Sequence, residues 1–117
     1  MFGLKKSKNQ IDVNELKKQE SKIKMVLKEI NQYLCAHIAN QIQAGADTVQ
    51  IFDSWAGLIP NEKLFDYCYE PNNKIVDFCK KKKIPVICFP RGINKNYLEF
   101  ANIVKPDCLS LDYEIDP

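Results

Sequence analysis

The chain has 117 residues, of which 45% are hydrophobic, 27% charged and 10% aromatic, a composition typical of one soluble globular domain. No stretch approaches the ~20 apolar residues of a membrane-spanning helix, and the first residues lack the apolar core of a signal peptide. The formal charge is +2, and the pI of about 8.2 is below the values above ~9 typical of nucleic-acid-binding domains. These features predict a cytoplasmic protein that binds neither membranes nor nucleic acid.

The cysteines are the next feature that restricts the chemistry. They are Cys35, Cys68, Cys79, Cys88 and Cys108. Their number is odd, they form no Cys-x-x-Cys pair, and no histidine stands at ligand spacing from any of them. We therefore expect reduced, buried, structural thiols and no metal site.

Residues 1–20 are expected to form a polar N-terminal segment with a short helix, and residues 21–117 the rest of the fold. Asp12 followed by Glu15 has the form of a helix start. Between Ser21 and Gln43 apolar residues recur in steps of three and four, which predicts one long amphipathic helix. The stripe consists of Ile23, Val26, Leu27, Ile30, Leu34, Ile38 and Ile42. Gly45 is well placed to end this helix.

Strands and helices then alternate along the chain. In chain order we expect a strand over 48–52, helices over 61–69 and 71–82 separated near Glu70–Pro71, a strand over 84–89, a helix over 96–103 and a strand over 108–111. The four lysines at 80–83 precede Ile84–Pro85, so they are expected to interact with the carbonyls at a helix end. An anion- or RNA-binding patch is the alternative interpretation of this run.

This order predicts a parallel α/β fold. The strands are apolar on both sides, as expected when helices cover one face and a packed interior covers the other. Three such strands cannot close a barrel, so two strand edges and one apolar face would be open.

The most unusual polar residues follow the three predicted strands. They are Asp53, Ser54 and Trp55 after the first, Arg91 and Gly92 after the second, and Asp112 and Tyr113 after the third. Because the carboxyl ends of parallel strands meet on one face, this pattern favours a site for a polar ligand there. Ordinary polar caps of strands are the alternative explanation. The arginine can pair bidentately with a carboxylate, which favours an acidic ligand.

The sequence does not support a catalytic triad or a phosphate-binding loop. The sole histidine, His37, lies on the long helix away from Ser54, so no Ser/His/Asp arrangement is expected, and we assign no catalytic residue. No glycine-rich phosphate-binding loop is present in the sequence.

Three segments carry a resemblance to a known family. Residues 44–57, AGADTVQIFDSWAG, resemble a characteristic segment of the uroporphyrinogen decarboxylase family. Residues 89–92 resemble the FPKG turn of that family, with Arg91 in place of lysine. Residues 109–113 resemble its GLDW strand end, with Ser110 and Tyr113 as the differences.

The resemblance implies an α/β fold that is part of a (β/α)₈ TIM barrel, usually homodimeric. It implies an enzyme of haem biosynthesis that decarboxylates the four acetate side chains of uroporphyrinogen III to give coproporphyrinogen III, without a metal or an organic cofactor. Ser54 matches the serine that contacts the acidic side chains of the substrate. Asp53, Trp55, Arg91 and Asp112 are further substrate-binding candidates.

Other family segments have no counterpart in the sequence, namely the arginine-rich N-terminal segment, the tyrosine-bearing middle segment and the C-terminal histidine. We therefore expect a fragment that is inactive by itself and that associates with complementing barrel segments or with further copies. A non-catalytic, self-associating or partner-binding module is the alternative. The corrinoid-linked methyltransferase branch of the barrel is disfavoured, because its zinc ligands are missing.

Overall fold

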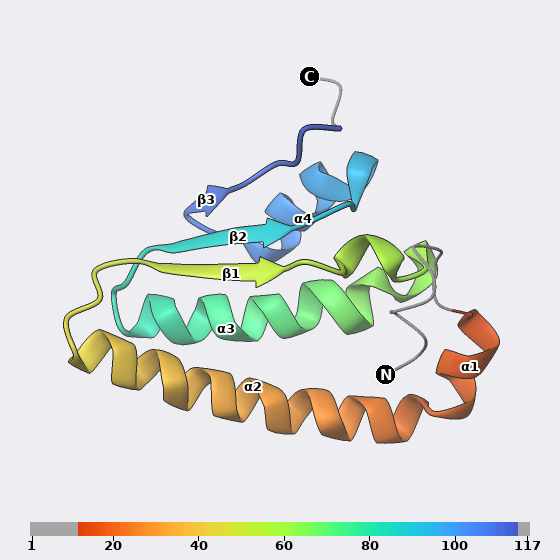
Figure 1. The fold of residues 1–117 in the computed structure, drawn as a ribbon, viewed down its shortest axis with the longest axis horizontal. Coiled ribbons are helices and arrows are strands. Elements are labelled where there is room, and N and C mark those ends of the chain that lie inside the picture. The colour runs from red at the N-terminus through yellow and green to blue at the C-terminus, as the bar shows by residue number, and fades with distance from the viewer. Residues whose placement is uncertain (1–11, 115–117) are drawn as a thin grey trace.

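The computed structural model describes residues 12–114 and has an α/β architecture (Figure 1). The helices are α1 (Val13–Lys18), α2 (Glu20–Gln43), α3 (Glu70–Lys81) and α4 (Tyr97–Val104); the strands are β1 (Val49–Asp53), β2 (Val86–Pro90) and β3 (Cys108–Leu109). The sheet has the order β1-β2-β3 and both strand pairs are parallel. The predicted fold class, three parallel strands alternating with helices as in part of a barrel, is confirmed.

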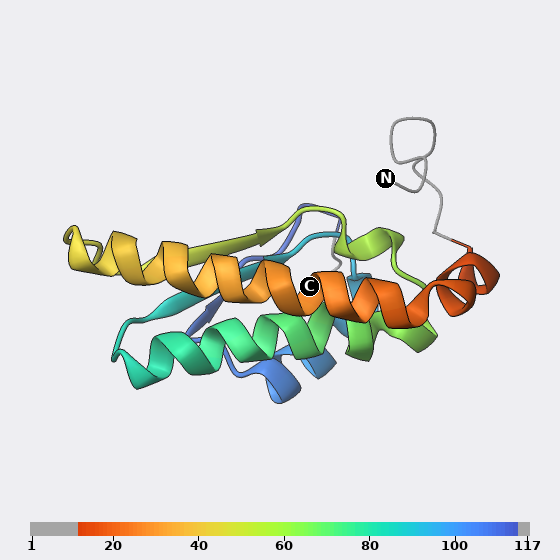
Figure 2. The same ribbon diagram turned by 90° about the horizontal axis from the view of Figure 1, so that it is seen from below.

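The strands are aligned so that their carboxyl ends lie together. Val49 pairs with Val86 and Asp53 with Pro90, and Ile87 pairs with Cys108. Helices α2, α3 and α4 lie side by side against one face of the sheet (Figure 2). We call this the covered face, and it bears Val49, Ile51, Asp53, Val86, Cys88 and Pro90. Because side chains alternate along a strand, the opposite face, here the open face, bears Gln50, Phe52, Ile87, Phe89 and Cys108.

The core lies between the covered face and the helices. Its buried members include Val86 and Cys88 from the sheet and Val76, Phe100 and Val104 from the helices. The Phe100 ring packs edge-to-face on Tyr69, with 5.7 Å between ring centroids. On the open face, by contrast, Phe52 is 65% exposed. The strands are apolar on both sides as predicted, but within residues 12–114 only one side has a covering layer.

Helices α1 and α2 begin and end close to where the sequence predicts. The Asp12 carboxylate caps α1 by accepting the N–H of Asn14 at 2.9 Å. Gly45, just beyond the end of α2, adopts φ +112°, a backbone conformation that glycine tolerates best. Of the predicted stripe of α2, only Ile38 is buried, and Ile30 and Leu34 remain about 40% exposed.

The segment between β1 and α3 differs from the prediction. Residues 61–69 do not form a separate helix: a 3₁₀ turn (Asn61–Lys63) is followed by a π-helical turn (Phe65–Tyr69) that continues directly into α3. The expected break at Glu70–Pro71 was wrong, because Pro71 lies in the first turn of α3, where its missing N–H costs no helical hydrogen bond. Strand β3 is also shorter than predicted and ends at Leu109.

The lysine run lies at the carboxyl end of α3, as predicted. Lys80 and Lys81 form its last turn, and the Lys82 ammonium lies 5.6 Å from the centroid of the Phe78 ring. Lys83 adopts a positive φ of 59° directly after the helix. Across residues 12–114, no helix is both long enough and apolar enough to cross a membrane.

The five cysteines are free thiols, and their environments differ. Cys68, Cys79 and Cys88 are buried and Cys35 is half-buried, but Cys108 is exposed. The prediction that Cys108 is buried was wrong, because its strand position faces the uncovered side of the sheet. In the described part of the chain, no three His, Cys, Asp or Glu side chains gather in a way that could hold a metal ion.

Candidate functional site

The loops that follow β1 and β2 are joined through the backbone of Arg91. The Arg91 N–H donates to the Asp53 carbonyl at 3.1 Å, and the Gly57 N–H donates to the Arg91 carbonyl at 2.9 Å. Ser54, Trp55 and Ala56 lie between these two hydrogen bonds. The turn that carries Ser54 is therefore held at both ends by one residue of the neighbouring loop.

Two glycines allow these loops to come so close together. A Cβ atom on Gly57 would lie 2.6 Å from the Gly92 carbonyl oxygen, which is too short for any side chain. Gly92 itself has φ +83°, in the region that favours glycine. The backbones of residues 57 and 92 are thus in direct contact, which explains why both positions need glycine.

Three of the five predicted site residues lie exposed at the carboxyl ends of the strands. Ser54, Trp55 and Arg91 are exposed, and we call this group the site rim. The Trp55 side chain is 56% exposed although it is large and apolar. A hydroxyl, an indole and a guanidinium are together suited to contact a ligand that has both acidic groups and an aromatic system.

Asp53, in contrast, points to the covered face of the sheet. Its carboxylate accepts a hydrogen bond from the Asn72 side-chain amide at 3.1 Å, and that amide also donates to the Cys68 carbonyl at 2.8 Å. Burial raises the pKa of Asp53 above its usual value, although the hydrogen bonds from Asn72 and Cys68 oppose this shift. The structure therefore places Asp53 between β1 and α3 and not at the site rim.

Asp112, half-buried, also makes contacts inside the protein. One oxygen of its carboxylate accepts the Gly92 N–H at 2.9 Å and the Tyr97 hydroxyl at 3.0 Å, and the other accepts the Glu114 N–H at 3.0 Å. Burial alone would raise the pKa of Asp112, but these hydrogen bonds and the charge of Arg91 hold it below its usual value.

Several residues of this region could not be identified from the sequence. Asn72 and Tyr97 lie in helices and carry no local signal for a role at the strand ends. Phe52 and Phe89 form an edge-to-face pair on the open face, with 6.3 Å between ring centroids. Alternation along the strands identifies this pair once the covered face is known, because Phe52 and Phe89 stand between residues of that face.

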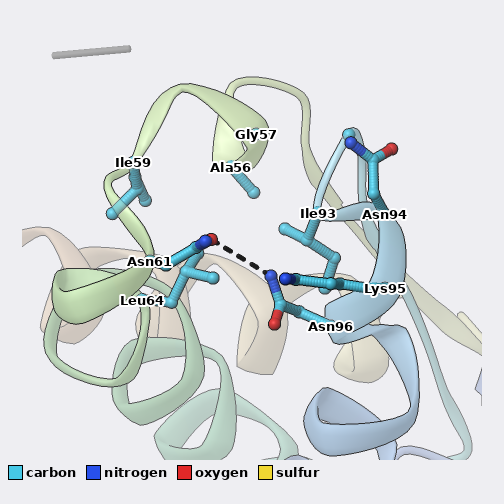
Figure 3. Close-up of a pocket in the computed structure, with 10 residues that line it drawn as sticks. Ala56, Gly57, Ile59, Asn61, Leu64, Ile93, Asn94, Lys95 and Asn96 are labelled. Atoms are coloured by element: carbon cyan, nitrogen blue, oxygen red, sulfur yellow. Dashed lines mark hydrogen bonds between the residues drawn. The ribbon is translucent and has the colours of Figure 1, made fainter.

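A cleft of about 280 Å³ lies between the loops after β1 and β2 (Figure 3). Its lining includes Ala56, Leu64 and Ile93, and the side chains of Asn61 and Asn96 hydrogen-bond across it at 3.2 Å. Among the residues that the structure describes, Lys95 is the only charged one that lines this cleft. The cleft is therefore mainly amide and aliphatic in character.

Comparison with known proteins identifies relatives of the chain. The model of the family "Uroporphyrinogen decarboxylase (URO-D)" matches residues 6–117. A uroporphyrinogen decarboxylase of Orientia tsutsugamushi (strain Boryong) is 38% identical over 114 residues, which cover 93% of this chain and 33% of the relative. The enzyme of Jannaschia sp. (strain CCS1) is 41% identical over 78 residues, covering 65% of this chain and 23% of the relative. The chain thus spans about a third of the length of the Orientia relative.

Proposed function

Because the chain belongs to the uroporphyrinogen decarboxylase family, we propose that it supplies part of the substrate site of such an enzyme. The proposed reaction is removal of the acetate carboxyl groups of uroporphyrinogen III to give coproporphyrinogen III, a step of haem biosynthesis. The observation that carries this proposal is the site rim, in which the Ser54 turn and Arg91 are joined by two backbone hydrogen bonds. Both belong to the region matched by the family model.

The chemistry of the substrate fits the rim. Uroporphyrinogen carries several carboxylates, and the Arg91 guanidinium and the Ser54 hydroxyl are donors for such groups. Protonation of a pyrrole ring carbon makes the ring an electron sink. The bond to the carboxyl carbon then breaks and CO₂ leaves; a proton adds to the remaining methylene carbon to give a methyl group, and the ring releases the proton it first took up. Neither Ser54 nor Arg91 needs to transfer a proton in this scheme, because their role is to hold and orient acidic side chains.

The open face adds apolar surface next to the rim. Phe52 directly precedes the Asp53–Ser54 step and is exposed beside Phe89. A tetrapyrrole has large apolar faces with acidic groups at its periphery, so an exposed aromatic pair beside hydroxyl and guanidinium groups fits both parts. Trp55 extends the same apolar character to the rim.

We further propose that complementing barrel segments cover the open face and the outer edges of β1 and β3. The chain aligns with only 33% of the Orientia enzyme, so that relative has further polypeptide outside the matched region. Within residues 12–114 the outer edges of β1 and β3 have no strand partner, and these edges, with the exposed Ile30 and Leu34 on α2, are the surfaces that such segments would cover. Activity is expected from the assembly and not from this chain alone.

Complementation tests the proposal directly. The 117-residue chain is mixed with the Orientia enzyme segments that flank the matched region, and coproporphyrinogen is measured after oxidation by its fluorescence. We expect product only from the full mixture, and Ser54→Ala and Arg91→Ala to lower the rate at least about tenfold, since each removes a hydrogen bond to a charged group. Ser21→Ala, an exposed serine on α2, is the matched control.

Two outcomes would count against the proposal. Association with the flanking segments without any product would favour a non-catalytic module. Equal rates for Ser54→Ala and Ser21→Ala would show that the Ser54 hydroxyl does not contact the substrate.

A further inference from the structure

The Asp112 carboxylate accepts hydrogen bonds from three donors of the protein although it lies at the carboxyl ends of the strands. The Gly92 N–H, the Tyr97 hydroxyl and the Glu114 N–H all donate to it, at 2.9 to 3.0 Å. An uncommitted carboxylate at this place would repel an acidic ligand. The Asp112 charge is instead engaged by donors of the protein itself, which come from the loop after β2, from α4 and from the segment after β3.

A continuous path leads from Asp112 to the turn that carries Ser54. Asp112 holds Gly92, and the backbone of Gly92 is in contact with that of Gly57. Gly57 in turn donates to the carbonyl of Arg91, whose own N–H donates to Asp53. Ser54 lies between Asp53 and Gly57, the two residues that these hydrogen bonds hold, so we expect a displacement of Gly92 to displace the site rim.

We propose that Asp112 is a positioning residue, which together with Tyr97 fixes Gly92 and thereby holds Ser54 and Arg91 in the arrangement that meets an acidic ligand. Asp112 does not itself contact the ligand. That the ligand is acidic rests on the proposed function, whereas the coupling from Asp112 to the Ser54 turn concerns the chain alone.

Tyr97 supplies a spectroscopic readout of the Asp112 contact. Its side chain is only 5% exposed, and burial together with the adjacent Asp112 carboxylate raises the pKa of Tyr97 to about 12. Removing the negative charge of Asp112 weakens one of these two causes. The pKa of Tyr97 then moves down toward 10.0, the ordinary value of tyrosine.

The first experiment uses the free chain without ligand. Amide hydrogen exchange of Gly57 and Gly92 is compared for the wild type, Asp112→Asn, Asp112→Ala and Tyr97→Phe, with Asp77→Asn as a control that removes an exposed charge on α3. We expect at least about tenfold faster exchange at both glycines in Asp112→Ala and Tyr97→Phe, because loss of a charge-assisted hydrogen bond loosens the loop locally. Exchange at Val86 and Val104 in the core should stay unchanged, which shows that the variants fold.

Ultraviolet titration identifies the tyrosine concerned. The phenol that ionises near pH 12 should be missing in Tyr97→Phe and should ionise at lower pH in Asp112→Asn, but not in Asp77→Asn. The proposal would be overturned if Asp112→Asn left the tyrosine titration unchanged. It would also be overturned if Gly57 exchanged no faster in Asp112→Ala than in Asp77→Asn, even if Ser54 binds substrate.

The assembled enzyme separates positioning from direct contact. Tyr97→Phe should reproduce the rate loss of Asp112→Asn, and the double variant should lose no more than either single variant, because both act on Gly92. A large loss in Asp112→Asn with none in Tyr97→Phe would assign Asp112 to the ligand and refute the positioning role.

Discussion

The covered face and the open face of the sheet are built from similar residues but have different surroundings. Val86 and Cys88 on the covered face are fully buried, whereas Phe52 and Cys108 on the open face are exposed. Burial of apolar side chains is what stabilises a fold, so the covered face carries the stability of the chain. The open face is free to contact other molecules. The difference teaches that a segment of a barrel can retain a core on its helix side while no element of the described residues 12–114 covers its interior side.

A pair of phenylalanines tests this comparison most strongly. Phe100 and Phe52 each pack edge-to-face on one aromatic ring, but Phe100 is fully buried and Phe52 is 65% exposed. We expect Phe100→Ala to lower the free energy of unfolding by about 3–5 kcal/mol and Phe52→Ala by less than about 1 kcal/mol, because only the first leaves a cavity. Urea denaturation followed by circular dichroism measures both. Equal losses would show that the two faces contribute alike.

Thiol reactivity gives the second test. Cys88 and Cys108 lie on neighbouring strands, and burial, with nearby Asp53 as a further cause, raises the pKa of Cys88 to about 12. We expect Cys108 to react with a maleimide at least about a hundredfold faster than Cys88, which reacts only when the core opens. Peptide mapping by mass spectrometry distinguishes the two sites. The difference should shrink when complementing barrel segments are added, because they would cover Cys108.

The smallest effect concerns Asp53, the carboxylate on the covered face. Its pKa is raised in the folded chain, so folding favours the protonated form, and stability falls as the pH rises from the ordinary value of ~3.9 through the raised one. Asp53→Asn keeps an acceptor for Asn72 and removes the charge. The free energy of unfolding of the variant should therefore exceed that of the wild type by an amount that grows from pH 4 to pH 7. The two proteins should be most similar at pH 4.

Denaturation at several pH values measures this gain, with the exposed Asp77→Asn as the reference for loss of one surface charge. Parallel curves for the wild type and Asp53→Asn would contradict the assignment of Asp53 to the covered face. Asp112 should behave in the opposite sense, since its pKa is lowered and its contribution to stability is lost as the pH falls.

Local patterns in the sequence were sufficient to predict most of the helices and strands, but not the segment between β1 and α3. The steps of three and four in α2 and the short apolar runs of β1 and β2 depend only on neighbouring residues, and the structure confirms them. The break expected at Glu70–Pro71 was wrong for a local reason too. A proline is compatible with the first turn of a helix as well as with a boundary, and no sequence signal indicates the π-helical turn before it.

The candidate site was predictable only in part. That Ser54 and Arg91 follow neighbouring strands can be read from the sequence, and their role toward a ligand stays a prediction. The partners of the two aspartates could not be predicted, because they depend on packing between distant segments. Asn72 lies 19 residues from Asp53, and Tyr97 lies 15 residues from Asp112. Alternation alone also left open which face of each strand the helices cover.

The π-helical turn at Phe65–Tyr69 has a consequence for how this segment tolerates changes in length. A π-helical turn contains one more residue than the α-helical turn that would replace it. A single deletion within it can therefore be absorbed by conversion to an α-helical turn, without rotating the α3 residues that follow. Homologous chains can thus lose one residue between the Ser54 loop and Asn72 while the Asn72–Asp53 hydrogen bond stays in place.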